Sequence, residues 1–345
     1  MSHHDEPLTY AKAGVSIEAG DAVVERIRPV VERTRRPEVL DAIGGFGGLF
    51  AIDPTRWTAP VMVTATDGVG TKLSLARQLG IHHTVGIDLV AMVVDDLVVS
   101  GAEPMVFLDY IAIGQVDQDV VADLVTGIAA GCEEAGCALV GGETAEHPGV
   151  MPATDYDLAG FGVGMVERDR ILGPDRVSEG DVLIAMASSG LHSNGYSLVR
   201  AIVNEYDLAQ DPDGRLGQPL GEALLAPTII YTKPCLALCA ANLVHAFCHI
   251  TGGGLPGNLP RVLPDHLGAQ VDTTTWEVPE LFTWLCETGN VAQEEAFSAF
   301  NMGVGMVAVV SPDDVDQTCS LLSEHGVTAW VCGEVTSTPG VELLS

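Results

Sequence analysis

The stretch from Pro60 to Lys72 constrains the fold of this chain more than any other. An apolar run, Pro60-Val61-Met62-Val63, predicts a buried strand, and Thr64-Ala65-Thr66-Asp67-Gly68-Val69-Gly70-Thr71-Lys72 follows it directly. Glycines in a turn let backbone N–H groups converge on an anion, and a lysine adds positive charge. A carboxylate repels phosphate unless a divalent cation lies between them. The stretch therefore predicts a strand that ends in a Mg-nucleotide site, although an ordinary turn before a surface helix would show the same residues.

Alternating strand and helix patterns predict an α/β (α+β) chain of two domains, for which 345 residues are sufficient. The polar run Glu167-Arg168-Asp169-Arg170, followed by Gly173-Pro174, predicts the boundary, so we expect domains at residues 1–168 and 169–345. Besides the opening strand, the expected helices and strands cover 14–36, 73–79, 86–100, 104–113, 117–136, 137–140, 156–167, 181–187, 196–205, 228–241, 244–250, 255–262, 303–310, 312–325 and 327–335. Residues 207–221 are predicted to be a loop because they are rich in Asp, Gly and Pro.

Further acidic residues support a metal site in the first domain. The segment Gly86–Ser100 is apolar nearly all round, which predicts a buried helix, yet it carries Asp88, Asp95 and Asp96. Carboxylates on a buried helix are costly unless they are paired or hold a metal. Glu143 follows Gly141-Gly142 in a second predicted strand-to-turn sequence. Because Mg²⁺ prefers octahedral oxygen ligands, Asp67, Glu143 and the Asp95/Asp96 pair together predict a Mg²⁺ site. A narrow solvent-facing stripe on the helix is the alternative.

Two loops in the second domain predict a site for a phosphorylated small molecule. The first, Ser189-Gly190-Leu191-His192-Ser193-Asn194-Gly195, offers hydroxyls, an amide, an imidazole and backbone N–H groups. The second, Thr251-Gly252-Gly253-Gly254, places glycine amides before a predicted helix, which is an anion site. His192 and His249 lie in these Gly/Ser/Thr-rich surroundings and are candidates for proton transfer or charge stabilisation. A structural hydrogen-bonding role is the alternative for each.

A third glycine-rich segment, Gly44-Gly45-Phe46-Gly47-Gly48, precedes the opening strand. Four glycines in five positions cannot form a stable helix interior, so the segment is predicted to be a loop whose backbone is unusually free. It either packs closely against another segment or flexes as a lid, and the sequence leaves both possibilities open.

The charge balance excludes nucleic acids and anionic membranes as partners. The net charge is −31, whereas such partners require a basic surface. Only Lys12, Lys72 and Lys233 are lysines, and an acidic, lysine-poor surface is typical of proteins kept soluble in high salt, so we expect a salt-loving host. Eight cysteines without a C-x-x-C pair predict no structural zinc. No apolar run approaches ~20 residues, and the polar start is no signal peptide, so the expected location is cytoplasmic.

Ordered motifs along the chain resemble those of the phosphoribosylformylglycinamidine cyclo-ligases, also called AIR synthetases. The resemblance extends from residue 10 to about residue 307. Its motifs are Tyr10-x-x-Ala13-Gly14-Val15, Gly45–Leu49, Thr66–Leu73, Gly86–Met92, Gly101–Pro104, Leu108–Tyr110, Gly141–Glu146, Asp157–Phe161, Ser193–Arg200, Thr251–Gly254 and Phe300–Met306.

The resemblance implies a step of de novo purine biosynthesis. Formylglycinamidine ribonucleotide and ATP give 5-aminoimidazole ribonucleotide, ADP and phosphate, through phosphorylation of the formamide oxygen and attack by the amidine nitrogen. It also implies a homodimer in which two N-terminal sheets join into a barrel, with helices on one face of each sheet. The C-terminal α/β sandwich covers the substrate. The cofactors implied are ATP and Mg²⁺, with K⁺ left open.

The resemblance assigns roles to matching positions. Lys72, His192 and His249 are the expected catalytic residues. The expected ATP ligands are Asp67, Gly68, Gly70, Thr71, Lys72, Asp88, Asp95, Gly141, Gly142 and Glu143, with Mg²⁺ on Asp67, Asp96 and Glu143. The expected substrate ligands are Ser189, Gly190, His192, Ser193, Asn194, Gly195, Thr251, Gly252, Gly253 and Gly254.

Two departures from the family pattern stand out. Asp95 occupies a position where the family usually has Asn, and His147-Pro148-Gly149-Val150-Met151 replaces the usual Met-Pro-Gly-Met-Tyr. One alternative function is a phosphoryl-transfer enzyme of the same superfamily, of the thiamine-monophosphate kinase or selenophosphate synthetase type. Another is a catalytically silent binding or scaffold subunit, which would be expected to lose Lys72 or the strand-end acids.

Overall fold

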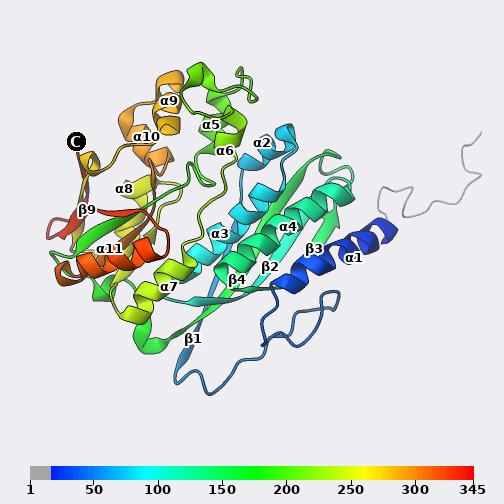
Figure 1. Ribbon diagram of the computed structural model, residues 1–345, viewed down its shortest axis with the longest axis horizontal. Coiled ribbons are helices and arrows are strands. Elements are labelled where there is room, and N and C mark those ends of the chain that lie inside the picture. The colour runs from blue at the N-terminus through cyan, green and yellow to red at the C-terminus, as the bar shows by residue number, and fades with distance from the viewer. Residues whose placement is uncertain (1–16) are drawn as a thin grey trace, which may run out of the picture.

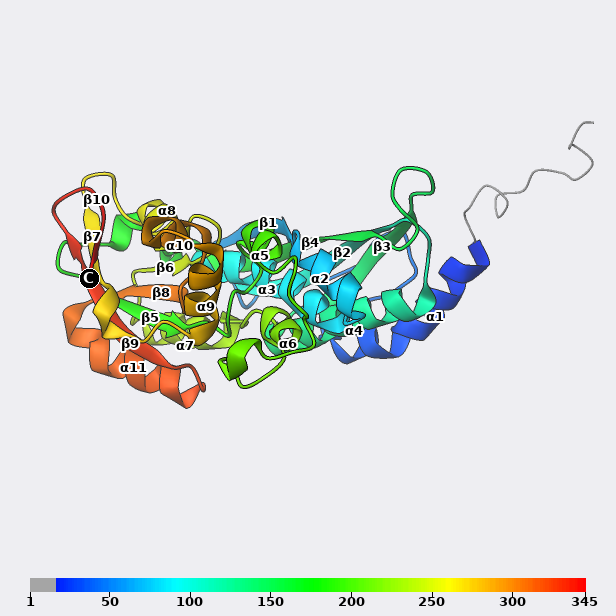
Figure 2. The same ribbon diagram turned by 90° about the horizontal axis from the view of Figure 1, so that it is seen from above.

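The computed structural model describes residues 17–345, which form two α/β units, each built on one sheet (Figure 1). The two units lie at opposite ends of the long axis, and helices α2, α3 and α5 lie where they meet (Figure 2). These helices cover Lys72–Leu79, His83–Val99 and Tyr196–Ile202. The Tyr10–Val15 motif and the predicted helix start at residue 14 lie outside the described residues.

A four-stranded sheet forms the first unit, with strand order β1-β4-β2-β3. β4 pairs antiparallel with both β1 and β2, and β2 pairs parallel with β3. Helices α1, α3 and α4 lie over one face of this sheet (Figure 1). The elements are α1 Ile17–Arg33, β1 Pro60–Gly68, β2 Glu103–Ile113, α4 Gln118–Ala135, β3 Ala138–Glu146 and β4 Tyr156–Glu167.

The two faces of this sheet differ because side chains alternate along each strand. Phe107 and Ile111 of β2 are buried under the helices, whereas Tyr110, on the opposite face, is exposed. The side chains of Met62 and Phe161 are likewise exposed, at 59% and 49%. The open face of the sheet therefore carries large apolar groups.

Helix α3 is buried because it packs on three sides. It lies against the sheet, against α4 and against the second unit, which explains its nearly uniform apolar sequence. The crossing with α4 is very close: a Cβ added at Gly127 would lie 1.8 Å from the carbonyl oxygen of His83. Any larger residue there would force the two helices apart.

The second unit contains a six-stranded sheet with order β10-β7-β9-β5-β8-β6. Strand β8, between β5 and the edge strand β6, is buried along its whole length. Besides α5, the elements are β5 Val182–Ala187, α6 Leu220–Leu224, α7 Thr232–Ala241, β6 Ala246–His249, α8 Gly254–Asn258, β7 Gly268–Asp272, α9 Glu280–Gly289, α10 Gln293–Ala299, β8 Val304–Val310, α11 Val315–Glu324, β9 Ala329–Thr336 and β10 Gly340–Leu344.

Several predicted elements need correction. β1 does not stop at Val63 but continues to Gly68, because its ladder with β4 runs through Asp67↔Gly160. β3 likewise continues through Glu143, paired with β2, so Glu143 does not lie in a turn. The predicted 255–262 helix is a five-residue α8 followed by a 3₁₀ turn at Leu259–Val262. Helix α6 begins inside the predicted 207–221 loop, and β7, α9, α10 and β10 were not predicted.

Within the part of the chain that the structure describes, no helix is both long enough and apolar enough to span a bilayer.

Candidate active site

Carboxylates and a histidine meet where the two units join. Asp67 lies at the end of β1, Asp96 on the exposed side of α3, and His249 at the end of β6. The Nδ1–H of His249 donates to Asp96 Oδ1 at 2.9 Å. Burial raises the pKa of Asp67, and the charge of Asp96 raises it further. Both carboxylates therefore lie in an environment that favours an added positive charge.

Asp95, next to Asp96, faces inward and is fully buried. One oxygen accepts the backbone N–H of Tyr231 at 2.9 Å, and the other has no hydrogen-bond partner among residues 17–345. Burial raises the pKa of Asp95 to about 7. Burial lowers the pKa of His249, but the hydrogen bond to Asp96 and the charges of Asp95, Asp96 and Asp67 outweigh it, so the net shift is upward.

The 189–195 loop places His192 in the interior of this junction. His192 is fully buried, and its backbone has a φ of 59°. Its Nε2 accepts the N–H of Ser189 at 3.2 Å, which leaves the proton on Nδ1. Burial lowers the pKa of His192 well below its ordinary value, so the ring is neutral. Its Nδ1–H has no partner among the described residues.

Other polar atoms of the two predicted loops are also buried without a partner in the described chain. They are Ser193 Oγ, Asn194 Nδ2 and His249 Nε2. Native proteins pair the large majority of buried polar groups, so such a concentration indicates a place where a polar ligand binds.

The glycine amides of the second loop do not form the predicted anion site. The N–H of Gly252 donates to Asn194 Oδ1 at 2.9 Å, that of Gly253 to Ser298 O, and that of Gly254 to Thr251 O. All three donors are therefore occupied. The following helix, α8, has only five residues and contributes little dipole. In this arrangement the loop supports Asn194 instead of presenting N–H groups to phosphate.

Lys72 and Asp88 form an ion pair that is wholly buried. Lys72 Nζ lies 2.7 Å from Asp88 Oδ2, and both side chains are fully inaccessible. Lys72 also donates to the carbonyl oxygens of His192 and Ala226, at 2.9 and 2.8 Å. This geometry contradicts the expected phosphate contact of Lys72 and the nucleotide contact of Asp88, because neither side chain faces open space. Nearby, Thr71 Oγ1 lies 3.4 Å from Ser197 Oγ.

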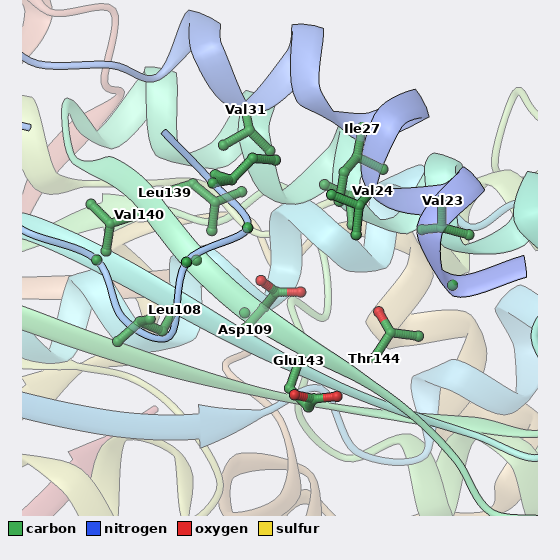
Figure 3. A pocket seen from close by; sticks show the side chains of 18 of the residues that line it. Val23, Val24, Ile27, Val31, Leu108, Asp109, Leu139, Val140, Glu143 and Thr144 are labelled. Atoms are coloured by element: carbon green, nitrogen blue, oxygen red, sulfur yellow. The ribbon is translucent and has the colours of Figure 1, made fainter. Parts of the chain in front are cut away.

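A cavity of about 600 Å³ opens at the other end of the first unit (Figure 3). Apolar side chains of α1 form one wall, the glycine loop 44–48 a second, and β3 a third, including Gly141, Gly142 and Glu143. A Cβ at Gly48 would lie 2.7 Å from Val140, so the loop packs closely here. Its volume falls within the ~300–1,000 Å³ typical of small-molecule sites.

Asp109 of β2 also lines this cavity. Burial raises the pKa of its carboxyl group to about 7. Asp109 stands in register with Gly142 and Gly160, and Asp67 lies opposite Gly160 in the same row. Asp109 and Asp67 therefore share the helix-covered face of the sheet.

The three predicted metal ligands are not assembled into one preformed site. Glu143 pairs with Tyr110, one residue beyond the Gly142–Asp109 pair, and therefore points to the opposite face from Asp67. Within residues 17–345, no group of three or more His, Cys, Asp or Glu side chains is placed to hold a metal ion. Only Asp67 and Asp96 of the predicted three lie near each other.

The remaining predicted residues are placed as follows. Gly68 N–H donates to Asp67 Oδ1 at 2.7 Å, and Gly70 adopts a positive φ of 73° in the turn before α2. Ser189 Oγ donates to Pro227 O, and Gly190 O accepts from Asn301 Nδ2. At Gly195, a Cβ would lie 2.5 Å from the ring of Phe300. Thr251 Oγ1 lies 3.3 Å from Asn258 Oδ1.

Sequence reasoning missed Asp109, Thr228 and Tyr231. Thr228 donates to Asp88, and the N–H of Tyr231 donates to Asp95. The sequence pattern assigned both residues to a helix at 228–241. Asp109 belongs to the Leu108–Tyr110 motif, and a single acid within an apolar strand was the signal that could have identified it.

Comparison with known proteins decides the family. The chain is 53% identical over 337 residues to a phosphoribosylformylglycinamidine cyclo-ligase of Methylobacillus flagellatus, covering 97% of this chain and 96% of that protein. The chain belongs to this family. The models described as AIR synthase related protein, N-terminal and C-terminal domain, match residues 55–166 and 178–344. The family resemblance seen in the sequence, with the ligase class and the two-domain α/β fold, is thus confirmed.

Solved structures of other members of the wider fold are more distant. A thiamine-monophosphate kinase from Stenotrophomonas maltophilia matches with a TM-score of 0.68 and 20% identity, covering 93% of this chain and 95% of that one. The hydrogenase maturation protein HypE in complex with ATP matches with a TM-score of 0.66 and 18% identity, covering 94% and 88%. At these identities the likeness shows the fold that the cyclo-ligase family shares with them.

Proposed function

We propose that this chain catalyses the ATP-dependent closure of formylglycinamidine ribonucleotide to 5-aminoimidazole ribonucleotide in purine biosynthesis. ATP phosphorylates the formamide oxygen, the amidine nitrogen attacks that carbon, and phosphate leaves with the former formamide oxygen. The observation that carries the proposal is the group of unpartnered buried atoms at the junction, from His192, Ser193, Asn194 and His249, beside Asp67 and Asp96. A polar substrate there would satisfy these groups within reach of a metal-bound phosphate.

The nucleotide places its phosphates at the Asp67/Asp96 pair and extends towards the cavity lined by Gly141, Gly142 and Glu143. The cavity volume and its apolar α1 wall suit a nucleobase. Asp67 and Asp96 are oxygen donors from separate elements, and burial, with the charge of Asp96 added, raises the pKa of Asp67, so the two acids fit Mg²⁺. Bound there, Mg²⁺ would offset phosphate charge. Glu143 belongs to the residues that line the cavity, but it points to the opposite face of the sheet from Asp67 and is not assigned to Mg²⁺.

The two histidines have different roles. His249, whose pKa is raised and whose Nδ1–H is held by Asp96, offers Nε2 for proton transfer during ring closure. His192 stays neutral and donates its free Nδ1–H to an oxygen of the substrate. Ser193 Oγ and Asn194 Nδ2 contribute the nearest additional hydrogen bonds, and the Thr251–Gly254 loop supports Asn194.

A second copy of the chain covers the open face of the N-terminal sheet. Exposed Met62, Tyr110 and Phe161 on one face of a twisted sheet form a patch that a partner sheet would bury. Two such sheets would close into the barrel that the family resemblance implies. We assign residues 1–168 to nucleotide binding and dimerisation, and residues 169–345 to covering the substrate.

The setting that we propose is the cytoplasm of a salt-adapted organism. All eight cysteines are free in the described chain, which suits a reducing compartment. The net charge of −31 suits high salt, where screening makes self-repulsion tolerable. A requirement for K⁺ would appear as a difference in turnover between KCl and NaCl at equal ionic strength.

One assay tests the proposal directly. Purified protein with formylglycinamidine ribonucleotide and Mg-ATP should release ADP and 5-aminoimidazole ribonucleotide in equal amounts, faster in molar KCl than in dilute buffer. Matched NaCl reactions separate a K⁺ requirement from an ionic-strength effect. Thiamine monophosphate serves as the competing substrate. No ADP release in any salt, or release with thiamine monophosphate alone, would overturn the assignment.

A further inference from the structure

Lys72 joins the two units of the molecule at one buried point. It begins α2 in the first unit, and both of its hydrogen-bond partners belong to the second. Its Nζ contacts Asp88 Oδ2 at 2.7 Å, His192 O at 2.9 Å and Ala226 O at 2.8 Å. Two of the three N–H donors of the ammonium go to carbonyl oxygens, and Asp88 Oδ2 lies close enough to balance its charge. The side chain is fully buried, so it does not face open space where a nucleotide phosphate could reach it.

Asp88 extends the same connection to a second segment. Its Oδ1 accepts both the N–H of Thr228, at 2.8 Å, and the Thr228 hydroxyl, at 2.6 Å. The ring of Tyr196, which follows the 189–195 loop, lies 5.5 Å from Lys72 Nζ, and its hydroxyl donates to Leu224 O. One buried ion pair thus fixes residues 192–196 and 224–228 against the start of α3.

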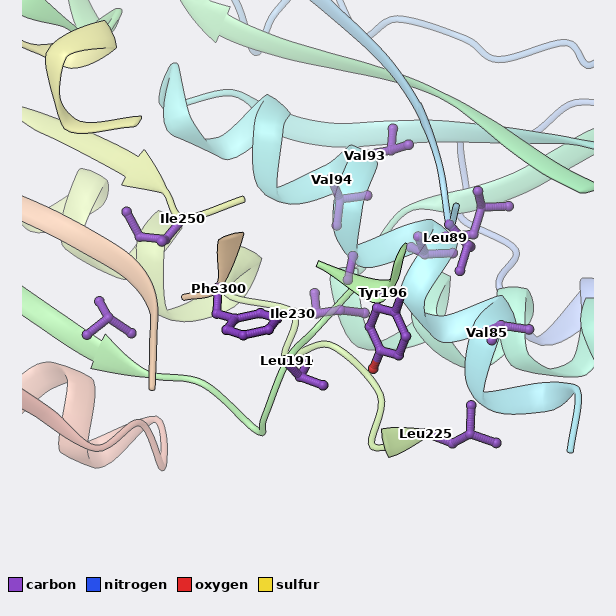
Figure 4. Packing of buried hydrophobic residues seen from close by; sticks show 14 of the residues in the cluster. Val85, Leu89, Val93, Val94, Leu191, Tyr196, Leu225, Ile230, Ile250 and Phe300 are labelled. Carbon is purple, nitrogen blue, oxygen red and sulfur yellow. The ribbon is translucent and has the colours of Figure 1, made fainter. Parts of the chain in front are cut away.

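Apolar packing surrounds this connection and excludes water from it. Val85 and Leu89 of α3 lie in the same cluster as Leu191, Tyr196 and Leu225 of the second unit (Figure 4). In such surroundings an ammonium and a carboxylate are costly to bury unless their geometry is nearly ideal. Apolar residues of similar size would fill the same space about as stably. Stability alone therefore does not explain the ion pair.

The contact between Lys72 and the backbone of His192 gives the ion pair a role in orienting a site residue. His192 has a φ of 59°, in the left-handed region that only a few per cent of non-glycine residues adopt. Its carbonyl faces Lys72, while its side chain carries the unpartnered Nδ1. Holding the carbonyl therefore sets the direction in which the imidazole points. Gly190 and Gly195 flank it with φ values of 144° and 76°, so the loop has little conformational preference of its own.

We propose that Lys72 is a positioning residue, which acts with Asp88 to hold the 189–195 loop in its substrate-binding conformation and does not contact the nucleotide. This inference rests on the proposed function of that loop. It replaces the phosphate role expected from the sequence with one across the domain junction.

The experiment compares wild type with Lys72→Met/Asp88→Asn. This double variant removes both buried charges together, and the Asn oxygen can still accept from Thr228, so the protein is expected to fold. The KM for formylglycinamidine ribonucleotide should rise at least tenfold, whereas the Kd for Mg-ATP, measured by calorimetry, should stay within twofold. A tenfold weaker Mg-ATP Kd with an unchanged substrate KM would overturn the proposal, because it would show a direct nucleotide contact.

A second readout does not depend on catalysis. Amide hydrogen exchange should accelerate at residues 189–196 in the double variant and stay unchanged at residues 141–146 of β3. Unchanged exchange at 189–196, or equal acceleration in both segments, would contradict the positioning role. If wild type released no ADP, the proposed function would fail, and the exchange result would still test the connection by itself.

Lys233→Met is the matched control. Lys233 also crosses between the units, 3.5 Å from Glu133 O, but its side chain is exposed. Its removal should leave the substrate KM, the Mg-ATP Kd and the exchange at residues 189–196 as in wild type. A tenfold rise in substrate KM in this control would show that any interdomain lysine has the effect, and would overturn the specific role of Lys72.

Discussion

The two halves of helix α3 carry aspartates with opposite surroundings. Asp88, in the first half, has a cation and a threonine as partners and no access to water. Asp95 and Asp96, in the second half, have an unpartnered oxygen and an exposed carboxylate. Both halves contact the second unit, but only in the first is a buried acid paired with a lysine. Burial of an acid alone does not distinguish the two ends, whereas the presence of a buried lysine beside it does.

The largest effect is expected from removing Asp88, the charge partner of Lys72. Asp88→Asn would leave the Lys72 ammonium buried without a counter-charge, which costs about 3–5 kcal/mol. Urea unfolding at pH 7 should show this loss, and adding Lys72→Met should recover most of it. A loss below about 1 kcal/mol would mean that the two charges are not coupled as their 2.7 Å separation implies.

Breaking the acid pair that Asp67 of β1 forms with Asp96 of α3 should affect chemistry instead of stability. Asp67→Asn removes one of the two acids that we assign to Mg²⁺, so turnover should fall on the order of 10²-fold or more. The melting temperature should stay within a few degrees, because burial and the charge of Asp96 both disfavour the ionised form of Asp67. Turnover and thermal melting of the same preparation test this. Survival of turnover would remove Asp67 from the metal assignment.

Asp109 extends the comparison to an acid that lines a cavity and has no ion-pair partner among residues 17–345. Its folded pKa of about 7 lies above the unfolded value of ~3.9, so ionisation destabilises the folded state as pH rises from about 4 to 7. A three-unit shift corresponds to about 4 kcal/mol, and water at this partly exposed group reduces it to on the order of 2 kcal/mol.

Asp109→Asn should therefore be more stable than wild type at pH 8 and equal to it at pH 4. Urea unfolding of both proteins at fixed salt, across this range, measures the difference. A difference that does not change with pH would show that Asp109 titrates normally and that the cavity is well hydrated around it.

The sequence predicted the order of elements well where periodicity was strong. Helix α3, helix α4 and strand β4 lie where expected, because their apolar patterns are long and regular. The 255–299 region was not resolved by pattern, since its helices are only five to ten residues long and α8 contains a proline. The ends of β1 and β3 were placed too early because Thr, Gly and Asp favour turns, whereas pairing with β4 and β2 extends both strands.

The sequence named some residues of the candidate site but not its arrangement. Asp67, Asp96, His192 and His249 lie near the junction of the two units, and their roles stay predictions. Sequence alone could not show that Lys72 is enclosed, because its partners include two carbonyl oxygens from the second unit. A sequence motif does not show which backbone atoms a side chain contacts. Nor could it show the face of β3 on which Glu143 lies, because that depends on register with β2.

One titration compares the Lys72–Asp88 ion pair with the acid pair of Asp67 and Asp96 near the other end of α3. Mg-ATP binding is measured by calorimetry for wild type, Asp67→Asn and Lys72→Met/Asp88→Asn, at the same salt and pH. We expect Asp67→Asn to lose at least tenfold in affinity and the double variant to stay within twofold of wild type. The opposite pattern, with nucleotide binding lost in the double variant and kept in Asp67→Asn, would contradict the account.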